Sequence, residues 1–86
     1  MPEVSRFFGI VIRMYFDDHQ PPHFHAIYAG FEAQVGIDPI MVLDGKLPNR
    51  AVSMVLEWAA LHQGELMHNW RRLRSDQPIE RIEPLA

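Results

Sequence analysis

Three of the five histidines in this 86-residue chain fall within seven positions, at His19, His23 and His25. Imidazole titrates near neutral pH, binds divalent metals and transfers protons, so such a cluster is a candidate chemical site. Pro21 and Pro22 lie between these histidines. Because proline fixes its own φ and biases the preceding residue toward extended backbone, we expect the segment to hold a defined shape.

The cluster is compatible with two kinds of chemistry. In the first, His19, His23 and His25 bind a divalent metal together with Asp18, since nitrogen and carboxylate ligands suit zinc, manganese or iron. In the second, His23 and His25 act without a metal as general base and general acid, as in phosphodiester cleavage. The structural alternative is a polar sheet face whose imidazoles hydrogen-bond to neighbours such as Gln34 or Asp18.

The segments that position these histidines have the patterns of strands and turns. Residues 7–16 alternate between two faces and predict one strand, and residues 23–28 and 31–37 predict two more. The aspartates and prolines of residues 17–22 predict a loop before the second strand. A two-residue turn at Ala29-Gly30 would join the second and third strands into a hairpin.

This hairpin predicts where the histidines point. With the turn at Ala29-Gly30, Phe24 faces Val35 on an apolar side, and His25 faces Gln34 on the other side. Alternation then places His23 beside His25 on the more polar face, with their Cα atoms about 6–7 Å apart. We therefore expect both imidazoles to project outward from the hydrophobic interior.

The rest of the chain completes an α+β prediction. Residues 40–47 predict a second short hairpin around Asp44-Gly45, a favoured turn pair. Asn49 is the expected N-cap of one long helix that reaches about Arg74, with Gly64 as the expected point of any kink. Residues 1–86 thus form a single domain: a small, mostly antiparallel sheet of hairpins (7–48) packed against one helix (49–75), with an extended C-terminal tail (76–86).

Several residues outside the cluster are further candidates for the site. His62 lies near Trp58 on the predicted helix and is a third candidate catalytic imidazole, although it equally suits a position covering the edge of the core. The candidate contacts to a phosphate or a partner protein are basic residues: Lys46, Arg50, Arg71, Arg72 and Arg74. The last three also suit the negative end of a helix dipole.

Composition excludes several functional classes. The chain has no cysteine, which rules out disulfides and thiolate-bound metals. Its net charge of −3 disfavours sequence-independent binding of nucleic acid. It has no glycine-rich phosphate loop, no nucleophile elbow, no signal-peptide pattern and no apolar run of membrane-spanning length, so we expect a cytoplasmic protein that does not enter the membrane.

The sequence also resembles a bacterial family of domains of unknown function, number four-one-six-zero. The resemblance extends over nearly the whole chain and rests on Ile12–Tyr15, His19–His25, Tyr28, Gly45–Pro48, Trp58, His62, Glu65-Leu66, Asn69-Trp70 and Ile82–Leu85. Members are often encoded beside a second small protein, in pairs that look like toxin–antitoxin modules, and some carry a transcriptional-regulator label. The resemblance implies no activity and no catalytic residue.

Three functional hypotheses follow. The resemblance favours a cytoplasmic component of a two-gene regulatory module that binds the second small protein, through the sheet face or the arginine-bearing helix end; a homodimer is a further alternative. The second hypothesis is a ribonuclease-like toxin that uses His23 and His25, with Lys46, Arg50 or Arg72 near the phosphate. The third is a metal-binding module built on the histidine cluster.

Overall fold

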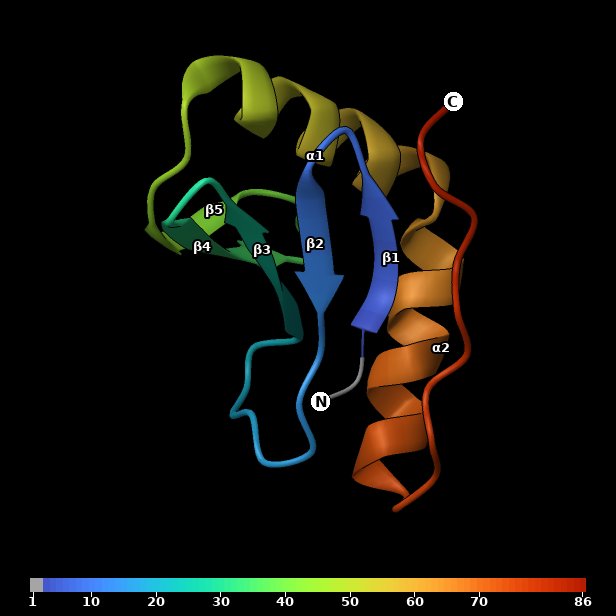
Figure 1. Ribbon diagram of the computed structural model, residues 1–86. Helices are drawn as coiled ribbons and strands as arrows, with labels where there is room; N and C mark the ends of the chain where they lie inside the picture. The colour runs from blue at the N-terminus through green and yellow to red at the C-terminus, as the bar shows by residue number, and fades with distance from the viewer. Residues whose placement is uncertain (1–2) are drawn as a thin grey trace.

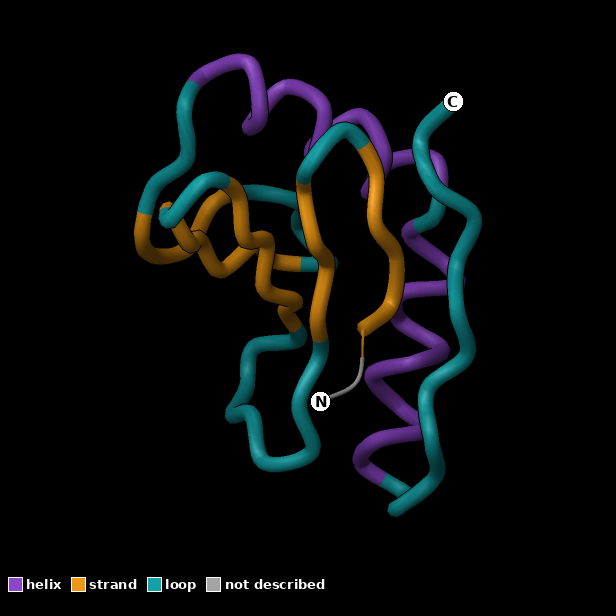
Figure 2. Tube along the Cα trace, viewed as in Figure 1, coloured by secondary structure: helices purple, strands orange, loops and turns teal. Residues whose placement is uncertain are grey.

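The computed structural model describes residues 3–86 as an α+β fold of one five-stranded sheet and two helices (Figures 1 and 2). The sheet is antiparallel throughout, with its strands in chain order. The elements are β1 (Glu3–Phe7), β2 (Ile10–Arg13), β3 (His23–Tyr28), β4 (Phe31–Gly36), β5 (Val42–Gly45), α1 (Asn49–Leu61) and α2 (Gln63–Arg74). The predicted fold class is confirmed, but the predicted single long helix is wrong.

The hairpin of β3 and β4 has the predicted register. Ala29 and Gly30 form its turn with φ values of 49° and 85°, the left-handed conformation that a two-residue turn with matching twist requires. Phe24 pairs with Val35, and His25 pairs with Gln34. Since side chains alternate along a strand, Phe24 enters the core while the histidines lie on the opposite face.

The predicted strand over residues 7–16 is wrong, because the chain reverses within it. Phe8 and Gly9 adopt φ values of 50° and 80° and form the turn between β1 and β2. Phe7 then pairs with Ile10, and both are buried, whereas Phe8 is 60% exposed. The sequence gives no sign of this turn, because Phe7 before it, Phe8 within it and Ile10 after it are all apolar.

The predicted second hairpin at residues 40–47 is also wrong. Asp44-Gly45 does not reverse the chain but ends β5, a single edge strand that pairs with β4. Gly45 has a φ of 75°, and a Cβ there would collide with the Glu32 carbonyl oxygen. The Lys46 amide donates to that same carbonyl at 3.2 Å, so close backbone approach explains this glycine.

The helical segment divides into two helices at His62, rather than bending at Gly64 as predicted. The His62 amide donates to the carbonyl oxygens of Trp58 and Ala59 and closes α1, and Gln63 Nε2 donates to the Ile37 carbonyl at 2.7 Å as α2 begins. The Asn49 N-cap prediction is wrong, because Pro48 occupies that position and no side chain caps the helix. The two helices separate because they pack against different parts of the molecule.

Helix α1 covers the apolar face of the sheet through Trp58. Its indole ring lies 5.4 Å from the ring of Phe7 and 5.8 Å from that of Phe24, between ring centroids. Trp58 Nε1 donates to the Glu83 carbonyl at 2.8 Å, so the tail also crosses this layer. The Ile82 amide donates to the Val4 carbonyl at 2.9 Å, so the tail lies back on the sheet.

Helix α2 and the tail run side by side along the β1 edge of the sheet (Figure 1). Buried Asn69 fastens them together, since its side chain donates to the Glu80 carbonyl and accepts from the Glu80 amide, both at 2.8 Å. Neither helix in the described part of the chain has the length and apolar character needed to cross a membrane.

Candidate metal centre

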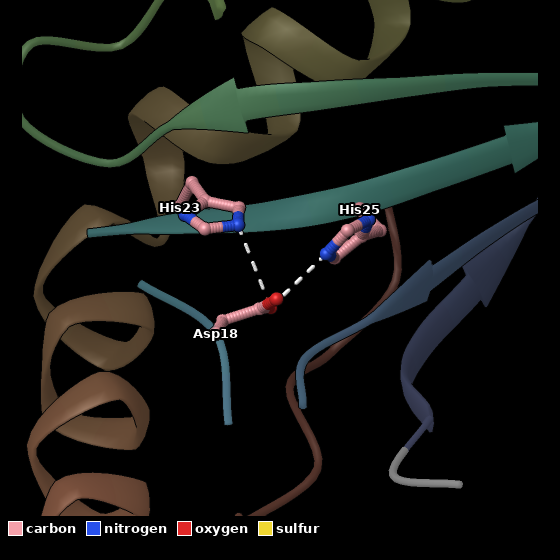
Figure 3. Close-up of side chains that lie close together, drawn as sticks. All are labelled: Asp18, His23 and His25. Atoms are coloured by element: carbon pink, nitrogen blue, oxygen red, sulfur yellow. Dashed lines mark hydrogen bonds and ion pairs between the residues drawn. The ribbon is translucent and has the colours of Figure 1, made fainter. Parts of the chain in front are cut away.

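Asp18, His23 and His25 converge above the polar face of β3 (Figure 3). The two histidines project from the same face of the strand, as predicted, and the loop between β2 and β3 folds back to place Asp18 over them. Asp18 Oδ2 lies 3.0 Å from His25 Nε2 and 3.5 Å from His23 Nε2. One ligand atom from each residue lies within 4.8 Å of the other two.

The expectation that these imidazoles project outward is wrong. His23 is 5% exposed and His25 is 7% exposed. Two aromatic rings cover them: Tyr15 makes a T-shaped contact with His25 at 4.6 Å between centroids, and the ring of Trp70 in α2 lies 5.6 Å from that of His23. The sequence pattern identified the correct face of the sheet, but it gave no sign that the preceding loop and α2 would cover that face.

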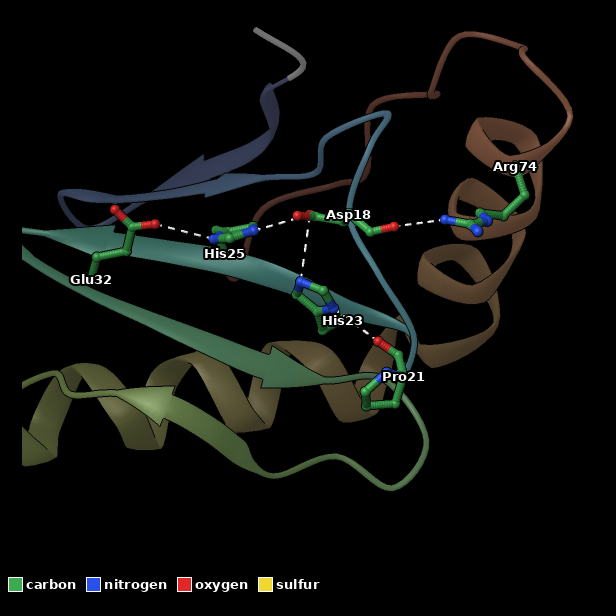
Figure 4. Close-up of polar contacts among 6 residues, drawn as sticks. All are labelled: Asp18, Pro21, His23, His25, Glu32 and Arg74. Atoms are coloured by element: carbon green, nitrogen blue, oxygen red, sulfur yellow. Dashed lines mark hydrogen bonds and ion pairs between the residues drawn. The ribbon is translucent and has the colours of Figure 1, made fainter.

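Each imidazole is held by a second contact through its Nδ1 atom (Figure 4). His23 Nδ1 donates to the Pro21 carbonyl oxygen at 2.8 Å, and His25 Nδ1 lies 3.1 Å from Glu32 Oε2. A carbonyl can only accept, so the neutral form of His23 carries its proton on Nδ1 and directs the lone pair of Nε2 toward Asp18. Metal-binding histidines usually have this arrangement of an Nδ1–H donating to a carboxylate or a carbonyl.

The two separations that involve the Asp18 carboxylate suit a metal ion. Bonds of about 2.0–2.1 Å in a tetrahedral arrangement place neighbouring ligand atoms about 3.3 Å apart. The two separations from Asp18 Oδ2, 3.0 and 3.5 Å, bracket that value. Three protein ligands leave at least one position for water or a substrate, which is the pattern of catalytic zinc sites, and two histidines with one carboxylate also suit ferrous iron.

The cluster also has a metal-free form. His25 places Nδ1 against Glu32 and Nε2 against Asp18, and carboxylates only accept hydrogen bonds. Both contacts are therefore hydrogen bonds when His25 carries two protons. In that form the imidazolium, rather than a metal, neutralises the carboxylate of Asp18.

The other predicted histidines do not join the cluster. His19 is exposed and lies on the rim of a hollow beside His23, outside the group of converging ligand atoms. His62 Nδ1 lies 2.6 Å from Glu65 Oε1, and its ring stands 5.6 Å from Trp58. Because Trp58 packs on the opposite face of the sheet, His62 covers the edge of the core rather than supplying a third catalytic imidazole.

The predicted arginines near the end of α2 have separate roles. Arg74 Nη1 donates to the Asp18 carbonyl oxygen at 2.6 Å, and its guanidinium lies 5.4 Å from the Trp70 ring centroid. Arg72 Nε donates to the Pro78 carbonyl at 2.7 Å and holds the tail, while Arg71 is exposed. Arg74 therefore anchors the loop that carries Asp18, and it is the one arginine of the three that reaches the site.

The remaining predicted phosphate contacts lie apart from the histidines. Arg50 lines a hollow with Tyr28 at the far end of β3 from His23. Lys46 follows β5 and is exposed. The structure thus does not bring either cation to the cluster.

Three residues of the site were missed by sequence reasoning: Tyr15, Glu32 and Trp70. Glu32 could have been found, because the predicted register places it diagonally opposite His25 on the same face of the sheet. Tyr15 alternates onto that face as well. Trp70 gave no signal, since its contact with His23 depends on the direction that α2 takes after His62.

The fold and the cluster define a small α+β domain with a buried group of two histidines and one aspartate. The family model of a domain of unknown function, DUF4160, matches residues 9–71, which include all three residues of the cluster. The chain therefore belongs to this family, as the resemblance predicted. No curated protein matches the chain, and neither does any solved structure.

Proposed function

We propose that this protein binds one divalent transition-metal ion through Asp18 Oδ2, His23 Nε2 and His25 Nε2. The observation that carries the proposal is the convergence of these three atoms while each Nδ1 is held by a separate acceptor. Zinc and ferrous iron fit this ligand set better than manganese, because two of its three members are imidazoles. A bound ion would supply Lewis acidity to a ligand in its open position.

The surrounding residues support this role. Tyr15 and Trp70 exclude water from the imidazoles, and Glu32 holds His25 by its Nδ1 atom. Arg74 fixes the backbone at Asp18. These contacts prepare the ligands before the ion arrives, which lowers the entropy lost on binding.

The ribonuclease-like alternative has less support. Phosphodiester cleavage needs a cation beside the histidines to bind the phosphate. Of the predicted phosphate contacts, Lys46 and Arg50 lie elsewhere, and Arg74 uses Nη1 to hold the carbonyl of Asp18. Arg13 pairs with His25 across β2 and β3 and is a basic residue on this face of the sheet, so it is the acidic groups around the histidines that disfavour a phosphate. The carboxylates of Asp18 and Glu32 add negative charge where the phosphate would bind.

Binding of a second small protein in a two-gene module is our second proposal, together with bacterial origin and a cytoplasmic location. Membership of the family and one surface feature favour it. Phe8 is 60% exposed at the tip of the first hairpin and lines a hollow of about 390 Å³ with Tyr28, Arg50 and Met54. Co-purification of the neighbouring gene product with the native chain, and its loss in Phe8→Ser, is the test; recovery of no partner contradicts this proposal.

The metal proposal is tested with protein purified without an affinity tag. Titration calorimetry with Zn²⁺ should give one site per chain, and the variant with His23→Asn and His25→Asn should lose it. Zinc at about 100 times its Kd should stabilise the wild-type protein by about 2.7 kcal/mol. For a domain of this size that raises Tm by about 10–20 °C.

The matched control is the variant with His62→Asn and His68→Asn, which removes the same number of imidazoles from outside the cluster. It should bind zinc like the wild type. The absence of binding and of any melting shift in the wild type, or an equal loss in the control variant, contradicts the proposal.

A further inference from the structure

Two adjoining hollows beside the cluster form a groove along β4 and β5. It begins as a hollow of about 270 Å³ lined by Asp18 and His23, and also by Gln34 and Asp44. A second hollow of about 240 Å³ shares Gln34 and Asp44 and ends at Glu32. His23 is more than nine-tenths buried and still lines the first hollow together with Asp18, so the groove begins against two of the three residues of the cluster.

The carboxylates that line this groove give it a negative charge. Asp18, Glu32 and Asp44 supply three carboxylates to its lining. Within residues 3–86, the part of the chain that the structure describes, neither hollow is lined by a lysine or an arginine. The charge of a divalent ion at the cluster would be outweighed by these three carboxylates. The groove would therefore still repel anions after the ion is bound.

The remaining lining indicates the size and polarity of a ligand. Gln34 offers an amide for hydrogen bonding, and Leu43 offers apolar surface beside it. Asp44 lies where both hollows meet, and its Oδ1 accepts from the Gly45 amide at 2.9 Å, which fixes the orientation of the carboxylate. A short carbon chain ending in a cationic group fits this sequence of contacts.

We propose that the ligand of the metal site is a small molecule with an amine or guanidinium group, which binds in the groove beside Asp44 while a donor atom reaches the metal. The inference rests on the proposed metal function. It assigns Asp44 as a residue that determines specificity for a cationic ligand. It also implies that phosphates and carboxylates are not the preferred ligands.

The test uses three hydroxamates that share one metal-binding group and differ in the charge of the other end. β-Alanine hydroxamate carries an ammonium group, propionohydroxamate is neutral, and succinic monohydroxamate carries a carboxylate. Binding to the Co²⁺-loaded full chain is followed by the visible spectrum of the metal. We expect the cationic probe to bind about three to ten times more tightly than the neutral one, and the anionic probe to bind most weakly.

The variant Asp44→Asn keeps the oxygen that accepts from the Gly45 amide and removes the charge. It should reduce the preference for β-alanine hydroxamate to within about twofold, with unchanged affinity for Co²⁺ and for propionohydroxamate. The control is Glu57→Gln at an exposed position of α1, which changes the net charge equally and should keep the full preference. Added salt should weaken the preference in the wild type.

Equal affinities for the three probes, or tightest binding of the anionic one, overturns the inference about the groove while leaving the metal site in place. A preference that survives in Asp44→Asn also overturns it, because the charge then acts from elsewhere. A wild-type chain that takes up no Co²⁺ overturns both proposals, and this outcome is distinguished by the absent metal spectrum before any hydroxamate is added.

Discussion

Histidines meet carboxylates in two regions of this molecule, and only one region has the form of a site. On the α2 side, His62 pairs with Glu65 at 2.6 Å and His68 with Glu80 at 3.5 Å. At the β3 cluster, the two histidines share one carboxylate at 3.0 and 3.5 Å. The distances are similar, so proximity alone does not distinguish the two regions.

Burial and convergence make the difference. The glutamates on the α2 side and His68 are more than half exposed, and each histidine there has its own carboxylate. The imidazoles of the β3 cluster are buried, and their Nδ1 atoms have separate partners. Exposed pairs contribute little because water competes for them, whereas buried polar groups need a partner for every donor. The comparison shows that a site requires several groups arranged around one point.

Removal of the shared carboxylate should have the largest effect. Asp18→Asn replaces a charged ligand oxygen with a neutral amide, and we expect zinc affinity to fall by more than about 100-fold, beyond the usual effect of an outer partner. Titration calorimetry measures this loss. Glu65→Gln, the matching change on the α2 side, should leave the affinity unchanged; similar losses in both variants would remove the distinction between the two regions.

Loss of the carboxylate behind His25 should have the next largest effect. Glu32→Gln keeps the size of the side chain and weakens its hold on His25 Nδ1. We expect zinc affinity to fall by about 10- to 100-fold, as for other outer partners of metal-bound histidines. Glu80→Gln is the control, because Glu80 contacts an exposed histidine. An unchanged zinc affinity in Glu32→Gln would show that the contact between Glu32 and His25 Nδ1 does not contribute to metal binding.

A smaller effect is expected from Arg74→Gln. This change removes the hydrogen bond to the Asp18 carbonyl and the contact of the guanidinium with Trp70. The free energy of unfolding should fall by about 1 kcal/mol, since Arg74 is exposed and solvent weakens its contacts. Amide exchange should rise over residues 17–20, and zinc affinity should fall severalfold. Arg71→Gln serves as the control, and equal effects of the two changes would contradict the anchoring role of Arg74.

An exposed ion-pair network at the chain ends should give the smallest effect. The hydrogen bond from Arg6 lowers the pKa of Glu3 from 4.5 to about 2, with Arg81 of the tail adding to the shift. Because the folded state holds the carboxylate ionised, its stabilising effect is present above pH 4.5 and is lost as the pH falls through 2.

Glu3→Gln should therefore lower Tm slightly at pH 6, and the difference from the wild type should disappear by about pH 2. Melting curves from pH 6 to pH 2 measure this convergence, provided that both proteins still unfold cooperatively. A difference that grows toward acid would contradict the sign of the shift.

The part of the fold that could be predicted is the part fixed by local rules. Strict alternation and the turn at Ala29-Gly30 determined the register of β3 and β4, and so the face that carries His23 and His25. The turn at Phe8-Gly9 was missed because Phe7 and Ile10, the residues on either side of it, are apolar and continue the pattern of a strand. The break at His62 has no proline to mark it and results from the different surfaces that α1 and α2 cover.

The candidate site shows the same division. Glu32 follows from register, but the choice between Asp17 and Asp18 does not, because it depends on how the loop of residues 14–22 folds back over the sheet. The cover provided by Trp70 depends on the path of α2 after the break. Local pattern therefore predicts which side chains share a face, and tertiary packing decides which of them water can reach.

The position of Trp70 gives this domain an internal optical reporter. The chain has two tryptophans, and Trp58 lies across the sheet against Phe24, so an ion at His23 is much closer to one fluorophore than to the other. A paramagnetic ion such as Co²⁺ would quench the emission of Trp70 preferentially. Occupancy of the cluster can thus be followed by tryptophan fluorescence, without a label and at the concentrations used for folding experiments.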